Sequence, residues 1–397
     1  MTGILGHSQS CLTRSRQTSS AKRRALKVQS VAAPEAPAAP KRGAAAKRIK
    51  LGSSDLSVSE CCLGTMTWGG DQNSFEDASK QLSFAFDAGV NFIDTAEMYP
   101  VPPNKRYQGR TDLAIAPWLK QQRREDVVLA SKVSGYGNDW IRASGDKTRI
   151  SPSQIEQSVE ASLQRLGTDH LDLLQIHWPD RYVSLFGGPP YDPKNERPDD
   201  VPFKTQLEGL KRLVDAGKVR HVGVSNETAY GVTQFIRAAE EHSLPRIVSI
   251  QNCYNLFVRT GFEADLAEVC APRQCNVGLL AYSPLAGGVL SGKYLKNTAE
   301  PGSRLLRFEG YMARYTKQTA VEAMQAYCDI AQKYGVSPTE LALAWCQGQT
   351  WTACSIIGAT SMKQLKENIS AFDVELPEEA FNEINEVNKR YRDPAVR

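Results

Sequence analysis

A chain of 397 residues that is 41% hydrophobic and 23% charged has the composition of a globular protein able to bury a full core. No apolar run reaches the roughly 18 residues that a membrane-spanning helix needs, so we expect none. The nine cysteines are scattered, without a C-x-x-C pair or metal-ligand spacing. This pattern indicates reduced thiols and argues against a disulfide framework or a zinc site.

The positive charge is concentrated at the N-terminus. Residues 1–50 contain eleven Lys or Arg and a single acid, Glu35, so they carry a net charge of +10 and the rest of the chain carries −6. This division argues against a body that binds nucleic acid. Residues 1–46 are rich in Ser, Ala, Arg and Lys and have no long apolar core, which is typical of an organelle transit peptide.

We predict that this leader directs the chain to a plastid, with Val28-Gln-Ser-Val31-Ala-Ala-Pro near its cleavage site. A mitochondrial leader is the second choice, and a disordered basic tail that binds RNA or membrane is the structural alternative. Residues 47–397 are expected to form one domain.

From residue 47 onward, short β-branched runs alternate with amphipathic stretches of helical length. Residues 47–51 and 56–60 predict a hairpin. Further strands are predicted over residues 61–65, 90–94, 127–132, 171–177, 220–225, 247–252, 277–283 and 353–358. Helices are predicted over residues 75–89, 111–121, 152–167, 204–217, 227–242, 262–269, 318–334, 337–347, 361–372 and from residue 377. Ser74 and Ser151 are the expected N-caps of the first and third helices.

Strands that alternate with helices predict parallel pairing through helical crossovers. An open doubly wound sheet is the alternative, but it would usually carry a G-x-G-x-x-G turn after its first strand, and this chain has none. We therefore predict an α/β fold, a (β/α)8 TIM barrel with an N-terminal β-hairpin and extra C-terminal helices.

Barrel enzymes carry their chemistry where the strands end. Asp94 ends the second barrel strand, Tyr99 follows on a proline-stiffened loop, and Lys132 and His177 end the third and fourth strands. Any one of these residues by itself would more often have a structural role, either capping a turn or lying buried with its hydrogen bonds made. Together at one rim they indicate acid/base chemistry. His221 begins a strand, so no role is assigned to it.

The chain also resembles the aldo-keto reductase family from about residue 47 to residue 387. The resemblance is carried by the segments Leu63-Gly-Thr-Met-Thr-Trp-Gly69, Asn91-Phe-Ile-Asp-Thr-Ala-Glu-Met-Tyr99, Leu129-Ala-Ser-Lys132, Leu171-Asp-Leu-Leu-Gln-Ile-His177, Gly223-Val-Ser-Asn226 and Ser355-Ile-Ile-Gly-Ala359. The loop at residues 98–103 is most similar to a bacterial branch of single-domain reductases that also occurs in plastid-bearing organisms. The resemblance implies the barrel and a catalytic tetrad of Asp94, Tyr99, Lys132 and His177.

It further implies NADPH-dependent reduction of small aldehydes or ketones to alcohols by hydride transfer, with NADH as the other cofactor considered. Tyr99 is the expected general acid. Lys132, kept charged by Asp94, would assist proton release from the phenol, because an ammonium stabilises a phenolate. His177 would hydrogen-bond the carbonyl oxygen.

The resemblance implies that Ser225, Asn226 and Gln251 hold the nicotinamide carboxamide and that Tyr282 stacks on the ring. The glycine-rich loop at residues 283–293 would hold the pyrophosphate, although its pattern alone equally suits a flexible turn. The expected cofactor contacts are Thr65, Ser225, Asn226, Gln251, Tyr282, Ser283, Pro284, Leu285, Gly287, Lys293, Arg304, Gly358, Lys363, Gln364, Glu367 and Asn368. Many relatives have an arginine where Thr360 stands, so Lys363 is expected to bind the 2′-phosphate in its place.

The expected substrate walls are Trp68, Met98, Trp178 and parts of the loop at residues 186–203, which favour small or medium aldehydes and ketones. The alternative function is a catalytically weak nucleotide-binding sensor or partner subunit, since potassium-channel β-subunits resemble the same family. We expect a small carbonyl substrate as the partner, no metal, nucleic acid or membrane, and a monomer by default.

Overall fold

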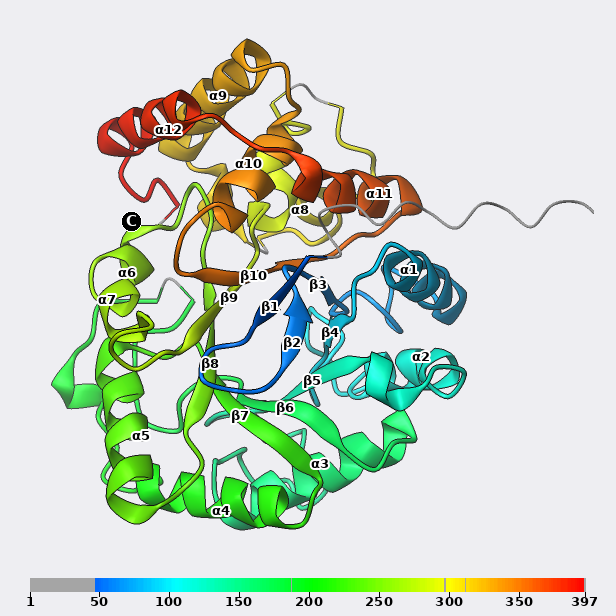
Figure 1. Cartoon of the computed structure of the whole chain (residues 1–397), viewed down its shortest axis with the longest axis vertical. Helices are drawn as coiled ribbons and strands as arrows, with labels where there is room; N and C mark the ends of the chain where they lie inside the picture. Colours follow the sequence, from blue (N-terminus) through cyan, green and yellow to red (C-terminus); the bar gives the residue numbers. More distant parts are fainter. Residues whose placement is uncertain (1–46, 187, 296–297, 311, 396–397) are drawn as a thin grey trace, which may run out of the picture. The chain divides into compact units, whose positions relative to one another are not determined.

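The computed structural model describes residues 47–186, 188–295, 298–310 and 312–395. Eight parallel strands close into a barrel in the order β10-β3-β4-β5-β6-β7-β8-β9, so the predicted fold is confirmed (Figure 1). The barrel strands are β3 (Cys61–Gly64), β4 (Phe92–Asp94), β5 (Val128–Val133), β6 (Leu171–Ile176), β7 (Val219–Ser225), β8 (Ile247–Cys253), β9 (Gly278–Tyr282) and β10 (Thr352–Ile357). The predicted leader lies outside the described residues.

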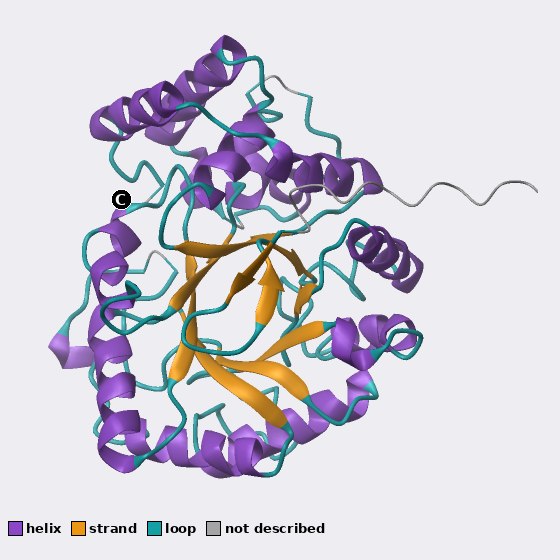
Figure 2. Cartoon of the chain, viewed as in Figure 1, coloured by secondary structure: helices purple, strands orange, loops and turns teal. Residues whose placement is uncertain are grey.

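Helices surround the ring of strands, as Figure 2 shows by colour. They are α1 (Phe75–Asp87), α2 (Arg110–Leu119), α3 (Pro152–Leu166), α4 (Phe203–Asp215), α5 (Ala229–His242), α6 (Thr260–Glu263), α7 (Leu266–Cys270), α8 (Arg304–Arg307), α9 (Gln318–Lys333), α10 (Pro338–Gln347), α11 (Met362–Ser370) and α12 (Glu378–Arg390). Ser74 and Ser151 cap α1 and α3 as predicted, each accepting a backbone N–H from the first turn.

Two differences from the predicted elements have local causes. The predicted helix over residues 262–269 is split into α6 and α7, because Asp265 leaves the helical conformation with φ −144°. The segment between β9 and α9, predicted as a longer loop, contains the 3-10 turns η4 (Ala286–Ser291) and η5 (Ala313–Thr316) and the short α8. Short turns of this kind have too few residues to show a helical period.

The predicted hairpin, β1 (Arg48–Lys50) and β2 (Ser57–Ser59), lies against the barrel interior at the start of the strands (Figure 1). Leu51, Leu56 and Val58 are buried in one cluster with apolar side chains of the barrel strands. Gly52 has φ +53°, and a Cβ there would lie 2.2 Å from the carbonyl oxygen of Val248 in β8. Only glycine fits this approach, so the hairpin fills the amino-terminal end of the barrel and leaves the other end for the site.

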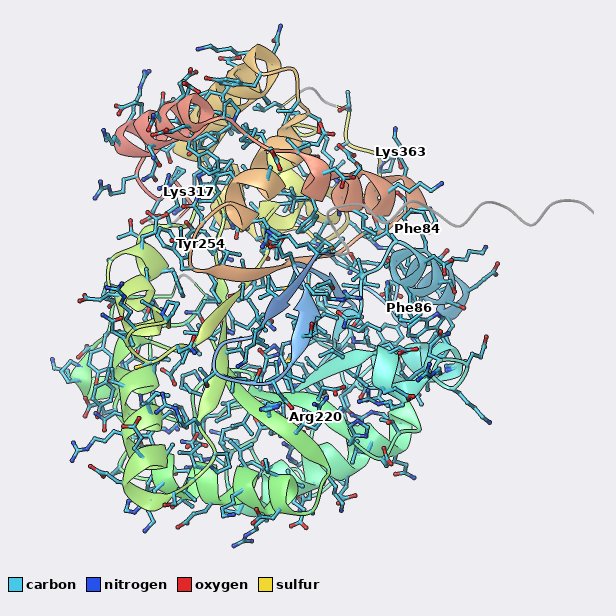
Figure 3. The ribbon with its side chains drawn as sticks, in the orientation of Figure 1. Phe84, Phe86, Arg220, Tyr254, Lys317 and Lys363 are labelled. Carbon is cyan, nitrogen blue, oxygen red and sulfur yellow. The ribbon has the colours of Figure 1, made fainter. Side chains whose placement is uncertain are left out.

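Aromatic pairs fix the helices on the barrel. The rings of Phe86 in α1 and Trp118 in α2 meet edge to face at 5.4 Å, and Tyr254 after β8 stacks on Trp345 in α10 at 5.3 Å. Phe86 and Tyr254 are labelled in Figure 3. Such pairs add about 0.5–1.5 kcal/mol beyond the area that they bury. The Tyr254 pair holds the C-terminal helices beside the ends of β8–β10.

Some findings concern only the part of the chain that the structure describes. Within it, no helix is both long and apolar enough to cross a bilayer. The eight cysteines that it contains are all free thiols, and no group of His, Cys, Asp and Glu side chains there could hold a metal ion.

Candidate active site

The four predicted acid/base residues meet at the carboxyl end of the barrel. Asp94 is the last residue of β4, Lys132 lies near the end of β5, and His177 directly follows β6. Adjacent-strand register places Asp94 beside Ala130 and Lys132 beside Gln175, so these strands end at one rim. The loop after β4 brings Tyr99 to the same place.

Lys132 is fully buried beneath this rim. Its ammonium donates to Asp94 Oδ2 at 2.5 Å, to the carbonyl oxygen of Thr95 at 2.8 Å and to Tyr99 Oη at 3.2 Å. Burial lowers the pKa of Lys132, but the charge and hydrogen bonds of Asp94 and Tyr99 outweigh it and raise the pKa above its usual value. Lys132 is therefore charged at neutral pH, and its ammonium contacts the Tyr99 hydroxyl.

Asp94 is held from several directions. Its Oδ1 accepts from Gln251 Nε2 at 2.9 Å and from Gln175 Nε2 at 3.2 Å, and its backbone oxygen accepts from Thr65 Oγ1 at 2.8 Å. Sequence reasoning missed Gln175, whose signal was an uncharged polar residue between the apolar Leu174 and Ile176 in β6. Gln251 lies at the cavity as predicted for a cofactor contact, yet its amide N–H also fixes the carboxylate.

His177 lies on the other side of the phenol. Its ring meets that of Tyr99 edge to face, with centroids 5.7 Å apart, and its backbone oxygen accepts from Asn226 Nδ2 at 2.8 Å. Burial, followed by the charge of Lys132, holds the pKa of His177 well below its usual range. The imidazole is therefore neutral, and its buried Nδ1 has no hydrogen-bond partner among the described residues.

A cavity of about 1170 Å³ opens over this group. Asp94, Tyr99 and His177 face it, whereas Lys132 lies beneath its floor. Every residue predicted to contact a cofactor lines this cavity: Thr65, Ser225, Asn226, Gln251, Tyr282, Ser283, Pro284, Leu285, Gly287, Lys293, Arg304, Gly358, Lys363, Gln364, Glu367 and Asn368. Asp94, Tyr99, His177 and the predicted cofactor contacts therefore line one cavity.

One part of the cavity suits an anion. Gly287 and Gly288 in η4 have φ +68° and +95°, and a Cβ at Gly288 would lie 3.2 Å from Lys293 Nζ. Burial first, and then the nearby Arg304, lowers the pKa of Lys293. In the described part of the chain Lys293 makes no ion pair. Two neighbouring cations beside a glycine turn fit a diphosphate group.

The amino-terminal end of α11 forms the far side of the cavity. Gln364 Oε1 accepts from the backbone N–H and the hydroxyl of Thr360 at 3.0 and 3.1 Å, and Asn368 Nδ2 donates to the Gly358 oxygen at 3.1 Å. Lys363 is exposed on the first turn of α11 (Figure 3). The side-chain amides of Gln364 and Asn368 thus hold the backbone before α11 in place, and Lys363 is the basic residue of the first helical turn.

The substrate walls agree only in part with the prediction. Met98 and Trp178 line the cavity, but Trp68 does not, because its fully buried indole donates to Gln81 Oε1 at 3.2 Å in the core. The chain turns after β3, where the Trp68 N–H binds the Thr65 oxygen, and this turn points the indole toward α1. The predicted wall position of Trp68 was wrong.

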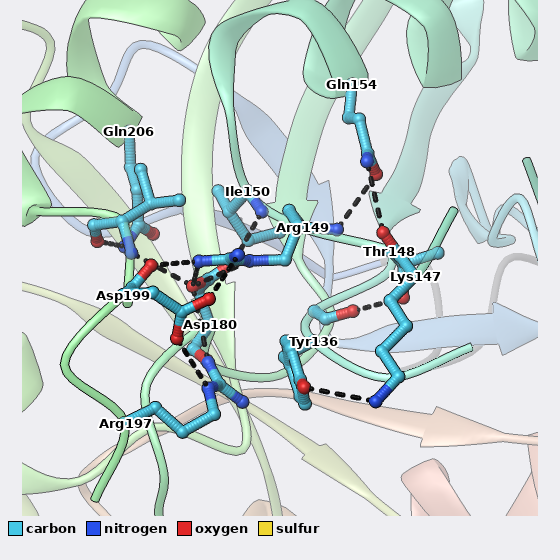
Figure 4. Close-up of polar contacts among 12 residues, drawn as sticks. Tyr136, Lys147, Thr148, Arg149, Ile150, Gln154, Asp180, Arg197, Asp199 and Gln206 are labelled. Atoms are coloured by element: carbon cyan, nitrogen blue, oxygen red, sulfur yellow. Dashed lines mark hydrogen bonds and ion pairs between the residues drawn. The ribbon is translucent and has the colours of Figure 1, made fainter. Parts of the chain in front are cut away.

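The loop after β6 contributes less than was predicted. Of the described residues within 186–203, only Phe186 lines the cavity. The buried carboxylate of Asp180 anchors this loop by accepting from Arg149 at 3.0 Å, from the Ile150 N–H at 2.8 Å and from the Val201 N–H at 3.0 Å, as Figure 4 shows. The loop is thereby tied to the segment after β5 that contributes Tyr136 and Asn138 to the cavity wall.

Comparisons with known proteins agree with this geometry. Residues 60–389 match the sequence model of the Aldo/keto reductase family. "Protein tas" of Escherichia coli (strain K12) is 42% identical over 347 residues, which cover 87% of this chain and 99% of that protein. An "Aldo-keto reductase" of Babesia bovis is 39% identical over 280 residues, covering 68% and 98%. A "Probable voltage-gated potassium channel subunit beta" of Arabidopsis thaliana is 28% identical over 328 residues, covering 82% and 90%.

Proposed function

Because the chain belongs to the aldo/keto reductase family and is an oxidoreductase, we propose that it reduces small aldehydes and ketones to alcohols with NADPH. The observation that carries this proposal is the contact of the buried Lys132 ammonium with both Asp94 and the Tyr99 hydroxyl. It is an arrangement for delivering a proton to an oxygen that becomes negative.

Tyr99 is the proposed general acid. A bound nicotinamide supplies the hydride, because no side chain can. As the carbonyl oxygen gains negative charge, the Tyr99 hydroxyl gives it a proton, and the ammonium of Lys132, 3.2 Å away, stabilises the phenolate that remains. Asp94 keeps that ammonium charged and in place.

His177 orients the carbonyl. Since the imidazole is neutral, it carries one N–H that can donate to the carbonyl oxygen without competing as an acid. The edge-to-face contact with Tyr99 supports a common target atom for the two side chains. Positioning of this kind contributes to rate as strongly as acid catalysis does.

The cavity lining fits a dinucleotide. We assign the carboxamide to Ser225, Asn226 and Gln251 and the ring to Tyr282, whose hydroxyl donates to Asn226 Oδ1 at 2.7 Å and so fixes the phenol. Lys293 and Arg304 would hold the pyrophosphate. Thr65, Ser283, Pro284, Leu285, Gly287, Gly358, Gln364, Glu367 and Asn368 complete the proposed binding surface.

The second candidate is a nucleotide-binding partner subunit, which the similarity to a plant protein named as a probable channel subunit favours. The four acid/base side chains in contact at one rim favour the enzyme. We also propose that residues 1–46 target the chain to a plastid, with mitochondria as the second choice. A fluorescent protein fused behind this leader would distinguish the two organelles.

The testing experiment is titration of the purified chain with NADPH and NADH, followed by a panel of aldehydes and ketones. The reductase requires steady NADPH oxidation that depends on the carbonyl compound. Binding of NADPH with no turnover of any panel member would favour the partner subunit instead.

A further inference from the structure

The lysines and arginines that line the cavity lie in different parts of it. Lys293 and Arg304 lie together near η4, and Lys363 lies on α11. Arg314, in η5, belongs to neither place. It lines the cavity beside Tyr282, where its positive charge opposes the burial that raises the pKa of that phenol.

The surroundings of Arg314 place it at the catalytic end. Its Nη2 donates to Tyr315 Oη at 3.0 Å and lies 4.0 Å from Cys253 Sγ. Cys253 is the register partner of Tyr282 in the barrel. Arg314 Nη1 donates to the backbone oxygen of Phe186 at 3.1 Å, and Phe186 lies in the loop that follows His177 and Trp178. The guanidinium therefore joins η5 to the substrate side of the rim.

Arg314 lacks a counter-charge within the part of the chain that the structure describes. Its hydrogen-bond partners there are all neutral, it makes no ion pair with the described residues, and its buried Nε has no hydrogen-bond partner among them. Six other partly or fully buried arginines pair with a carboxylate, namely Arg124, Arg142, Arg149, Arg165, Arg181 and Arg259. A half-buried cation without a carboxylate is costly, so it marks a place where an anion is received.

The cavity that Arg314 lines also has apolar side chains in its wall, among them Met98, Trp178, Leu185, Phe186 and Met312. We propose that Arg314 binds a carboxylate carried by the substrate, so that the preferred substrates are aldehydes or ketones bearing an acidic group on the side away from the carbonyl. This inference rests on the proposed reductase function and names its substrate class. Arginine suits the task because its planar fork binds carboxylates through paired N–H groups.

The test compares para-carboxybenzaldehyde with its methyl ester, which has nearly the same shape without the charge. We expect wild-type kcat/KM to be about tenfold or more higher for the acid. Arg314→Gln should lower kcat/KM for the acid by about 10- to 100-fold, since a hydrogen bond to a charged group is lost, and should leave the ester within about twofold. Arg314→Lys should restore part of the loss, because it returns the charge without the fork.

The matched control is Arg307→Gln, which removes the same charge from an exposed position outside the cavity and should leave both substrates unaffected. Binding is measured separately from turnover by tryptophan fluorescence, with the protein loaded with NADPH and titrated with para-(hydroxymethyl)benzoate or its methyl ester. Arg314→Gln should raise the Kd of the acid alone by a similar factor.

Three outcomes overturn the inference while leaving the reductase intact. Wild type could turn over both aldehydes equally well, Arg314→Gln could affect both equally, or that variant could weaken NADPH binding, which would assign the cation to the cofactor. Absence of any turnover would refute the proposed function instead. The alcohol titration would still decide whether Arg314 receives a carboxylate.

Discussion

The guanidinium of Arg142 holds both oxygens of the Glu97 carboxylate, at 2.6 and 3.1 Å, two residues before Tyr99. Both side chains are buried. Glu97 Oε1 also accepts the Ser134 N–H at 2.7 Å, and the Glu97 N–H donates to the Lys132 oxygen at 3.2 Å. The pair thus ties the loop that carries Tyr99 to the strand that carries Lys132.

Glu97→Gln should destabilise the protein by about 3–5 kcal/mol, because it leaves the buried Arg142 without its counter-charge. Urea unfolding measures the loss. The control is Asp215→Asn, which breaks the exposed pair with Lys211 and should cost less than about 1 kcal/mol. Equal costs for the two variants would show that the buried pair does not anchor this loop.

Tyr99→Phe should lower kcat by about 10²–10⁴-fold, the usual contribution of a general acid, while the Kd for NADPH stays unchanged. Single-turnover kinetics separates chemistry from product release. Tyr107→Phe removes a hydroxyl bound to Asp71 outside the cavity and should leave kcat unaltered. A Tyr99→Phe enzyme with wild-type kcat would exclude Tyr99 as the acid.

His177 should make the free energy of unfolding depend on pH. Its pKa in the folded protein lies well below its usual value, so the unfolded chain binds a proton first as pH falls below about 6.5. The contribution of His177 to the free energy of unfolding is therefore fully present above about pH 6.5. It is lost as the pH falls toward the folded-state pKa of His177, by up to about 1.4 kcal/mol per pH unit.

His177→Gln should remove this contribution and flatten the acid limb of a plot of unfolding free energy against pH. His242→Gln, at an exposed helix end, is the matched control and should leave the slope as it is. An unchanged slope in His177→Gln would mean that the imidazole titrates normally in the folded protein.

The sequence predicted the barrel and the rim because these depend on local patterns. A β-branched run that ends in Asp94 or Lys132 shows both the strand and the place where it stops. Trp68 was misplaced because its direction depends on a turn closed by a backbone bond to Thr65, which no periodicity reveals. Arg314 was missed because η5 is too short to show a helical period, and its neighbours come from distant segments.

The cofactor preference is tested at the amino-terminal end of α11, where Thr360 precedes the helix and Lys363 lies on its first turn. Lys363→Gln should raise the Kd for NADPH by about 3- to 10-fold and leave that for NADH nearly unchanged, since only NADPH carries the 2′-phosphate and an exposed charge contributes about 1 kcal/mol. Lys366→Gln is the matched control. Lys366 lies on α11 as Lys363 does, but its ammonium lies over the ring of Phe84 in α1 and it does not line the cavity. Thr360→Arg should tighten NADPH alone. If Lys363→Gln weakened both nucleotides equally, Lys363 would act on a group that they share, and the preference for NADPH would need another source.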